Sequence, residues 1–285
     1  MEGWLIYRKT DAETNKHFIR WFQTEAAHEQ VNLRLILREN LTIGISDGEP
    51  AIHLNGGVVT RPDFAVVRTI EPLLNQHLES LGISVYNNAD TARICNHKGL
   101  THSHVSSLGI PTNDTLFVDP NSGLTEQAPM AYPFVMKEAG GRGGQNVYLV
   151  TNTPEWEQLK DICFPDDLII QSAQHIQLGR DVRVFVVGST IIGAVLRKSD
   201  HDFRANYKLG GSAVWYRLSS QEVAIVSRIT ASFQFGMVGI DFLLDQNGRF
   251  IFNEIEDVVG SRTLSAVSDV NILRHYIQHI KSENP

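Results

Sequence analysis

The chain has 285 residues, 42% of them hydrophobic and 20% charged, which is enough to form a sizeable core divided over two or three closely packed lobes. Its formal net charge of −7, without a long basic run, argues against nucleic-acid binding and favours a basic over an acidic partner. No apolar stretch has the length of a membrane span or the pattern of a signal peptide. The two cysteines, Cys95 and Cys163, lack metal-binding spacing, so we expect free thiols, no disulfide and a cytoplasmic protein.

Strand and helix patterns alternate over the first 88 residues. Apolar runs from Trp4 to Tyr7, from Leu33 to Leu37 and from Phe64 to Val67 predict strands, and helical periodicity predicts a helix over residues 15–30. Residues 48–61 are weakly patterned and are interpreted as an insertion loop or a short hairpin. This stretch therefore predicts a small α/β layer.

A single helix is predicted from Thr91 to Leu108, because the stop signal Gly109-Ile110-Pro111 follows it. Lys98 lies inside that helix. Such a lysine is ordinarily a solvated surface residue, and nothing in the helix pattern alone gives it another role.

A glycine-rich loop follows the apolar strand pattern that ends in Lys137. The loop, residues 138–146, contains Gly140, Gly141, Gly143 and Gly144. Glycines let backbone N–H groups approach phosphate oxygens, and a lysine at the strand end adds a positive charge. The loop lacks the Walker spacing and leads into a strand from Val147 to Val150, which disfavours a P-loop. The alternative is an ordinary hairpin tip without a ligand.

Three acidic residues lie at or near strand ends in the last third of the chain. Asp241 ends one apolar run, and Glu254 and Glu256 end another, with the turn formers of residues 245–248 between the two runs. The pattern predicts a hairpin in which Glu254 and Glu256 share one face. Carboxylates gathered in this way suit Mg²⁺, which prefers oxygen ligands together with phosphate. The alternative is a set of solvated acids on an edge hairpin.

Two helices are predicted to flank this hairpin. Residues 219–222 have the sequence of a capping box and begin a helix. A terminal helix from Leu264 to Ile280 is expected to pack on the same lobe.

Together these features resemble the ATP-grasp ligases, in both order and approximate spacing. The matching positions are Lys98, Lys137, the glycine-rich loop, Gln171, the strand from Gly179 to Gly188, Arg197, the loop with Arg204 and Asn206, Asp241 and Glu254. Among these enzymes the chain is most similar to RimK-type ligases, which add glutamate or a related amino acid to a carboxylate. The resemblance implies an α/β fold with a pre-ATP-grasp domain at residues 1–88, a central lobe at 89–171 and a C-terminal lobe at 172–285. The nucleotide would lie between two antiparallel sheets.

The resemblance also implies roles for individual residues. ATP would be bound by Lys98 and Lys137, by the glycine-rich loop with its four glycines, and by a hinge formed by Gln171, Ser172 and Ala173. Family members usually have Gln-Glu and an aromatic residue at the hinge, so here we expect backbone groups to recognise adenine. Asp181 corresponds to an acid that faces the ribose, with a purely structural hydrogen-bond acceptor as the alternative.

The catalytic and metal-binding residues follow from the same resemblance. Two Mg²⁺ ions, with Mn²⁺ as a substitute, would be held by Asp241, Glu254 and Glu256. Glu256 replaces an asparagine of the family pattern, and the acceptor-facing segment after it also departs from that pattern. Four residues are expected to hold the substrate carboxylate or the acyl phosphate or to close over it, namely Arg183, Arg197, Arg204 and Asn206.

The expected activity is that of an ATP-dependent carboxylate–amine ligase that forms an acyl phosphate. It would join an amino acid such as glutamate to a small-molecule, peptide or protein carboxylate, without nucleic-acid or membrane partners and with a homo-oligomer as one expected assembly. One alternative is an ATP-binding regulatory protein that keeps the fold without turnover. Another is an ATP-independent metal hydrolase, which ranks last because no histidine ligands accompany the acids.

Overall fold

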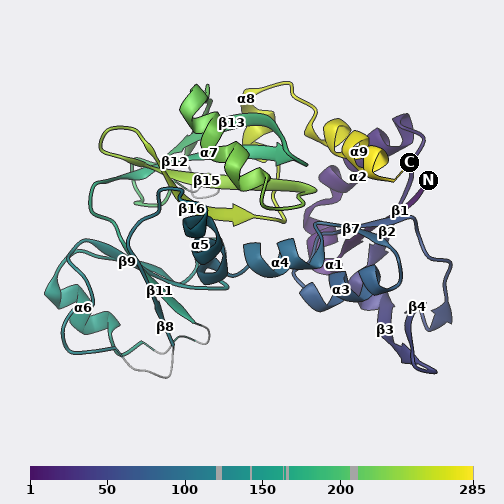
Figure 1. The fold of residues 1–285 in the computed structure, drawn as a ribbon, viewed down its shortest axis with the longest axis horizontal. Helices are drawn as coiled ribbons and strands as arrows, with labels where there is room; N and C mark the ends of the chain where they lie inside the picture. Colours follow the sequence, from purple (N-terminus) through teal and green to yellow (C-terminus); the bar gives the residue numbers. More distant parts are fainter. Residues whose placement is uncertain (120–123, 142, 163, 165–166, 206–210, 285) are drawn as a thin grey trace.

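The computed structural model describes the chain except for residues 120–123, 142, 163, 165–166, 206–210 and 285. Within the described residues the strands form a parallel sheet near the N-terminus, a small hairpin sheet beside it, and two larger antiparallel sheets (Figure 1). We refer to the three larger ones as the N-terminal, central and C-terminal sheets. This mixed α/β architecture is the fold class that the sequence predicts.

The N-terminal sheet has the strand order β2-β1-β6-β7, with every pair parallel. Its elements in chain order are β1 (Glu2–Tyr7), α1 (Lys9–Thr14), α2 (Lys16–His28), β2 (Asn32–Leu37), η1 (Arg38–Asn40), β6 (Phe64–Val67), α3 (Pro72–Ser80) and β7 (Ser84–Tyr86). Leu5 shares a core with Phe22 of α2, whereas Ile6 packs in a second core with Leu74 of α3. Both faces of β1 are therefore covered, which explains its unbroken apolar run.

The hairpin sheet contains β3 (Leu41–Ser46), β4 (Glu49–Leu54) and β5 (Gly57–Val58). Its first turn has positive φ at Asp47 (52°) and Gly48 (84°), the conformation that matches the twist of a two-residue hairpin. The weakly patterned segment is thus a short hairpin, and its first strand begins earlier than predicted.

The helix predicted from Thr91 to Leu108 is wrong, because the structure has two helices there: α4 (Ala89–Cys95) and α5 (Lys98–Ser107). The ring of His97 caps α5 by accepting from the backbone N–H of Leu100 at 3.2 Å. A histidine in extended conformation ends one helix and starts the next, since its ring nitrogen satisfies an otherwise unpaired N–H group. Lys98 is therefore the first residue of α5, not an interior one.

The central sheet has the order β10-β9-β11-β8 and is antiparallel throughout. Its elements are β8 (Thr115–Val118), β9 (Phe134–Glu138), β10 (Val147–Val150), α6 (Thr153–Leu159) and β11 (Leu168–Ser172). The cap of α6 is Asn152, whose side chain accepts from the N–H of Glu155 at 3.0 Å. Trp156 of α6 is buried against Phe134 and closes one face of the sheet.

The C-terminal sheet has the order β14-β13-β12-β15-β16 and is also antiparallel. It contains β12 (Ile176–Val187), β13 (Thr190–Lys198), β14 (Ser212–Trp215), β15 (Met237–Asp245) and β16 (Phe250–Glu256), with α7 (Ser220–Thr230) packed on it. The predicted capping box is confirmed, because Ser219 and Glu222 exchange hydrogen bonds at the start of α7.

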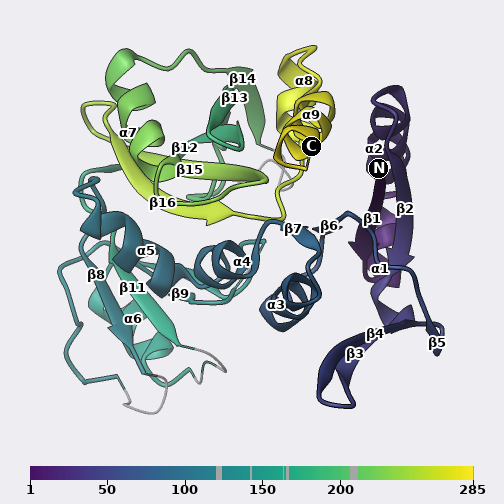
Figure 2. The same cartoon turned by 45° about the vertical axis from the view of Figure 1, so that its right-hand side comes forward.

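The terminal helix predicted from Leu264 to Ile280 is wrong as a single element, because α8 (Arg262–Val267) and α9 (Ile272–Glu283) are separate. Tyr276 of α9 stacks on Phe22 of α2, with ring centroids 5.5 Å apart. In the same core α9 meets Phe185 of β12, so it joins the N-terminal and C-terminal sheets (Figure 2). In the described part of the chain, no helix is long and apolar enough to cross a membrane.

Candidate active site

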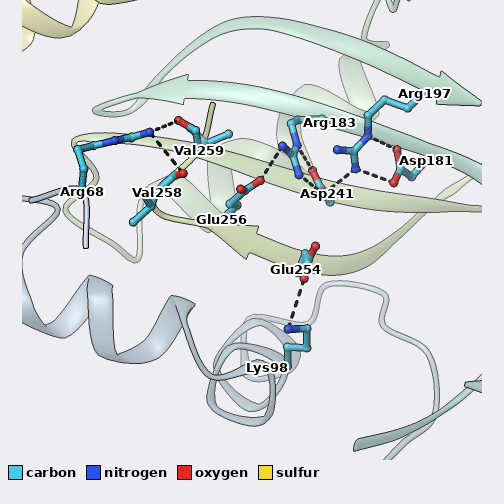
Figure 3. Close-up of polar contacts among 10 residues, drawn as sticks. All are labelled: Arg68, Lys98, Asp181, Arg183, Arg197, Asp241, Glu254, Glu256, Val258 and Val259. Atoms are coloured by element: carbon cyan, nitrogen blue, oxygen red, sulfur yellow. Dashed lines mark hydrogen bonds and ion pairs between the residues drawn. The ribbon is translucent and has the colours of Figure 1, made fainter. Parts of the chain in front are cut away.

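The C-terminal sheet brings five charged side chains into one row (Figure 3). The row runs from Glu256 through Arg183, Asp241 and Arg197 to Asp181, and each member forms an ion pair with the next. The register of β12 places Arg183 opposite Asp241 on β15 and Asp181 opposite Arg197 on β13. Opposed residues of neighbouring strands point to the same face of a sheet, which is why the row forms.

Asp241 is the centre of this row and is only 1% exposed. One carboxylate oxygen accepts from Arg183 Nε at 2.7 Å, and the other accepts from Arg183 Nη2 and Arg197 Nη2, both at 2.7 Å. Burial alone would raise the pKa of Asp241, but the two guanidinium groups lower it to about 2. Both oxygens of this predicted metal ligand are thus engaged by arginines.

Asp181 is buried and forms two parallel hydrogen bonds with Arg197, each 2.6 Å long. Burial raises the pKa of Asp181 to about 6, with Arg197 opposing the shift. Asp181 is paired with Arg197 inside the sheet. This is the geometry expected if Asp181 is a structural hydrogen-bond acceptor and does not face a ribose. Arg183 and Arg197, both predicted to contact substrate, are the cations that hold the row together.

The predicted hairpin is confirmed, because Asp241 on β15 lies opposite Glu254 on β16. The register then shifts by one residue, since the next pair is Phe242 with Phe252. Asn253 is therefore the extra residue of a β-bulge. The bulge turns Glu254 away from the side of the sheet on which Phe252 is buried.

The three predicted metal ligands do not form one cluster. Glu254 is 35% exposed and lies 3.8 Å from Lys98 Nζ, whereas Glu256 is 43% exposed and contacts Arg183 Nη1 at 2.6 Å. Within the described residues, no group of three histidine, cysteine or acidic side chains could hold a metal ion. As these side chains stand, they do not fit a two-ion centre, and Glu254 is the carboxylate among them that keeps an accessible oxygen without an arginine.

Lys137 of β9 is a buried cation, 7% exposed. Its Nζ donates to the Oδ1 of Asn253 at 3.4 Å, a contact that joins the central and C-terminal sheets. Among the described residues none forms an ion pair with Lys137. Burial lowers the pKa of Lys137 to about 8, against the opposing charge of Glu254. A buried ammonium group with so few partners is suited to an anionic ligand.

Lys98 lies beside the glycine-rich loop, where its Nζ donates to the backbone carbonyl of Gly141. Its backbone N–H also donates to the carbonyl of Ala139 at 2.9 Å. The break between α4 and α5 makes this possible, because it places Lys98 at a helix start. The structure thus brings together Lys98, Lys137 and the loop, to all of which the resemblance assigns ATP binding.

Arg204 also contacts the glycine-rich loop. Its guanidinium group donates to the carbonyl of Gly144 and is held by both oxygens of Asp202, at 2.9 and 2.6 Å. Gly143 and Gly144 have φ of 62° and 77°, a backbone conformation that favours glycine. Asp202 begins the segment of the family resemblance that contains Arg204, but no role for Asp202 is predicted from the sequence. Asn206 lies outside the described residues.

The side chain of Gln171 is buried in the predicted hinge. Its amide forms hydrogen bonds with the ring of His102 at 3.1 Å and with Thr115 Oγ1 at 3.0 Å. The backbone N–H groups of Ser172 and Ala173 both donate to carbonyls of the protein at 2.9 Å. Burial lowers the pKa of His102 to about 3, aided by the charge of Lys137, so this ring is neutral.

The arrangement of elements in this chain is similar to that of solved ATP-grasp proteins. The crystal structure of a RimK domain protein from Sphaerobacter thermophilus aligns with a TM-score of 0.73 and 18% identity, covering 99% of this chain and 100% of that one. The predicted ATP-grasp fold is thereby confirmed. The RimK-like ATP-grasp domain matches residues 97–280, more than half of the chain, so the chain belongs to this family.

Two curated relatives are similar over most of this chain. Beta-citrylglutamate synthase B from Danio rerio is 28% identical over 263 residues, which are 85% of this chain and 64% of that protein. N-acetylaspartylglutamate synthase A from Homo sapiens is 28% identical over 260 residues, covering 85% of this chain and 66% of that protein. The chain thus spans just under two thirds of the length of these two relatives.

Proposed function

We propose that this protein is an ATP-dependent ligase that joins an amine to a carboxylate through an acyl phosphate. The observation that carries the proposal is Lys137, a buried ammonium group that forms no ion pair with any described residue, in the hairpin that carries the glycine-rich loop. Lys98 contacts the same loop. Glu254 is the one carboxylate described near these two lysines, so a polyphosphate would supply further negative charge, and the family of the chain supports ATP as its source.

The proposed reaction has two steps. A carboxylate oxygen of the first substrate attacks the γ-phosphorus of ATP, the bond to the bridging oxygen breaks, and ADP leaves. The amine of the second substrate then attacks the acyl carbon, the bond to phosphate breaks, and the amine loses a proton. Lys98 and Lys137 would stabilise the phosphate charge that shifts in the first step. Arg183 is the better placed arginine for the acyl phosphate, because its partner Glu256 is partly exposed and can be exchanged.

Magnesium enters this proposal with the nucleotide. When bound, it would neutralise charge on the phosphate oxygens, and Mn²⁺ could replace it. Glu254 is the side chain best placed to hold it, since Asp241 is occupied by two arginines and Glu256 by one. A second ion held by Asp241 and Glu256 would require Arg183 to leave both of them.

Glutamate is the proposed amine substrate, because the names of both curated relatives are those of synthases of glutamate conjugates. The acceptor would be a carboxylate of a small molecule, a peptide or a protein tail. We also propose that the protein is cytoplasmic, as its two cysteines without metal-binding spacing lead us to expect.

A second candidate is a nucleotide-binding regulatory protein without turnover. The observation that favours it is the row of ion pairs, in which both oxygens of Asp241 are held by arginines. Such a row would keep the fold intact while leaving few free carboxylates for a metal ion.

Release of ADP and phosphate separates the two candidates. The purified protein is incubated with ATP, Mg²⁺, glutamate and a pool of carboxylic acids, while products are followed by coupled assay and mass spectrometry. The ligase proposal predicts ADP release that requires both glutamate and an acid, together with an amide product. ATP binding without ADP release under every condition would support the regulatory protein instead.

A further inference from the structure

The loop that follows Glu256 is held by side chains of the N-terminal sheet, which precedes the residues matched by the family. Arg68, directly after β6, donates from Nη2 to the carbonyls of Val259 at 2.8 Å and Val258 at 3.4 Å (Figure 3). Asn87, directly after β7, donates from Nδ2 to the carbonyl of Asp257 at 2.9 Å. Three successive carbonyls of one loop are therefore bound from the neighbouring sheet.

Arg68 is itself fixed in place by the N-terminal sheet. Its Nε donates to the Tyr7 hydroxyl at 3.2 Å, and its guanidinium carbon lies 5.2 Å from the centre of the Phe18 ring. No ion pair in the described part of the chain involves Arg68, although it is buried. A buried guanidinium group directed at backbone carbonyls can define the position of a loop, because it offers several donors in one rigid plane.

Asn87 joins the same loop to the start of β15. Its Oδ1 accepts from the N–H of Gly236 at 2.6 Å, and its Nδ2 also approaches the carbonyl of Met237 at 3.3 Å. Asn75 of α3 donates to the backbone carbonyl of Asn87 at 2.9 Å. Both strands of the hairpin that carries Asp241 and Glu254 are therefore tied to the N-terminal sheet.

The held loop is in turn packed against the charged row. A Cβ atom built on Gly239 would lie 2.8 Å from Val259 Cγ2 and 3.2 Å from Arg183 Cδ, so both side chains lie directly over this glycine. Val259 is fully buried. Glu256, the last residue before the loop, binds Arg183 Nη1 at 2.6 Å. A shift of the loop would therefore displace Arg183 through both Val259 and Glu256.

We propose that Arg68 and Asn87 are positioning residues of the active site, which set the loop 257–259 and, through it, the guanidinium group of Arg183. This inference rests on the proposed ligase function for its catalytic consequence. It assigns to the N-terminal sheet a part in the reaction, although that sheet lies outside the matched family region and supplies no residue to the charged row.

The test compares Arg68→Lys with a matched control, Arg61→Lys. Arg61 also donates to a backbone carbonyl, that of Leu81 at 3.1 Å, but this contact lies wholly within the N-terminal sheet and its helices. Lysine keeps the charge in both variants, but its single ammonium group cannot reproduce the planar set of donors. A second test variant, Asn87→Ser, decides the outcome if Arg68→Lys does not fold.

Two measurements are made on the full chain. Hydrogen exchange followed by mass spectrometry reports the amides of residues 257–261, and steady-state kinetics reports kcat and KM for ATP and glutamate. We expect exchange to rise at least roughly tenfold in Arg68→Lys and Asn87→Ser, since each loses contacts that close the loop. We expect kcat to fall on the order of a hundredfold, because misplacing a reactive group by about 1 Å has an effect of this size, while KM for ATP changes less than about twofold. Arg61→Lys should change none of these quantities.

The possible results separate the two proposals. Faster loop exchange with unchanged kcat, or unchanged exchange in both test variants, would overturn the positioning role. Equal losses in Arg68→Lys and Arg61→Lys would mean that both arginines contribute only to folding. If the wild-type protein turns over no substrate, the ligase proposal fails, and loop exchange alone still decides whether Arg68 and Asn87 hold the loop.

Discussion

The two arginines of the charged row and Lys137 are in opposite electrostatic situations. Arg183 and Arg197 are each bound to two carboxylates of their own chain, whereas Lys137 is buried with a single amide oxygen at 3.4 Å and no ion pair among the described residues. A charge that the chain itself neutralises contributes to architecture, and removing its partner is costly. A buried charge that the chain leaves without a counter-ion is the better candidate for ligand binding. The difference predicts that Asp241, at the centre of the row, controls folding and that Lys137 controls nucleotide affinity.

The largest expected effect is on stability, in Asp241→Asn. Loss of this buried carboxylate leaves Arg183 and Arg197 short of negative charge, which should lower the free energy of unfolding by roughly 3–5 kcal/mol. The pKa of Asp241 is lowered from 3.8 to about 2, so its contribution is complete above pH 3.8 and is lost as the pH falls toward 2. The difference from wild type in urea denaturation should therefore shrink over this pH range.

Asp90→Asn is the control for this comparison. Asp90 forms an exposed ion pair with Arg93 at 3.4 Å, and such pairs contribute little, so stability should change by less than about 1 kcal/mol. Equal losses in the two variants would contradict the structural role of Asp241.

The next effect is on nucleotide affinity, in substitutions of Lys137. Lys137→Ala should weaken binding of a non-hydrolysable ATP analogue on the order of tenfold to a hundredfold, because charge-assisted contacts contribute about 1.5–3 kcal/mol. Lys137→Arg should lose less, since it keeps a positive charge at the loop. Calorimetric titration at pH 7 measures both. Identical affinity in wild type and Lys137→Ala would identify the loop as an ordinary hairpin tip.

The smallest expected effect concerns Glu256, the exposed end of the row. Glu256→Asn should change the free energy of unfolding by less than about 1 kcal/mol, because a partly exposed pair is screened by solvent. It also restores the residue of the family pattern, so we expect it to retain much of the activity. Initial rates against Mg²⁺ concentration compare wild type, Glu256→Asn and Glu256→Ala. Superimposable curves for wild type and Glu256→Ala would show that Glu256 does not affect metal binding.

The sequence predicted the elements that depend on local pattern. Three such elements are confirmed, namely the hairpin that carries Asp241 and Glu254 on neighbouring strands, the strands on both sides of the glycine-rich loop, and the capping box at Ser219. Turn formers and capping residues act over a few positions, so the local sequence reports them. The lobe boundaries and the residue roles stay predictions. The family and the fold are confirmed by the comparisons.

The sequence did not predict the contacts between residues that lie far apart in the chain. The ion pairs of Asp241 come from two other strands, and the loop contacts of Arg68 span about 190 residues, so no local pattern reports them. The bulge at Asn253 did leave a signal. In a regular strand Phe250, Phe252 and Glu254 would all point to the same face, and Glu254 would lie in the apolar core. A register shift therefore had to lie between Phe252 and Glu254.

The central claim is that the nucleotide supplies the negative charge that Lys137 lacks, and proton uptake on binding tests it most directly. Burial lowers the pKa of Lys137 to about 8, so near this pH part of these side chains is neutral, and a bound phosphate would protonate them. Binding of the ATP analogue is measured by calorimetry at pH 8 in two buffers of different ionisation enthalpy, for wild type and Lys137→Arg. We predict that wild type takes up more protons on binding than Lys137→Arg, which cannot titrate in this range. Equal proton uptake by the two proteins would contradict the claim that Lys137 binds the phosphates.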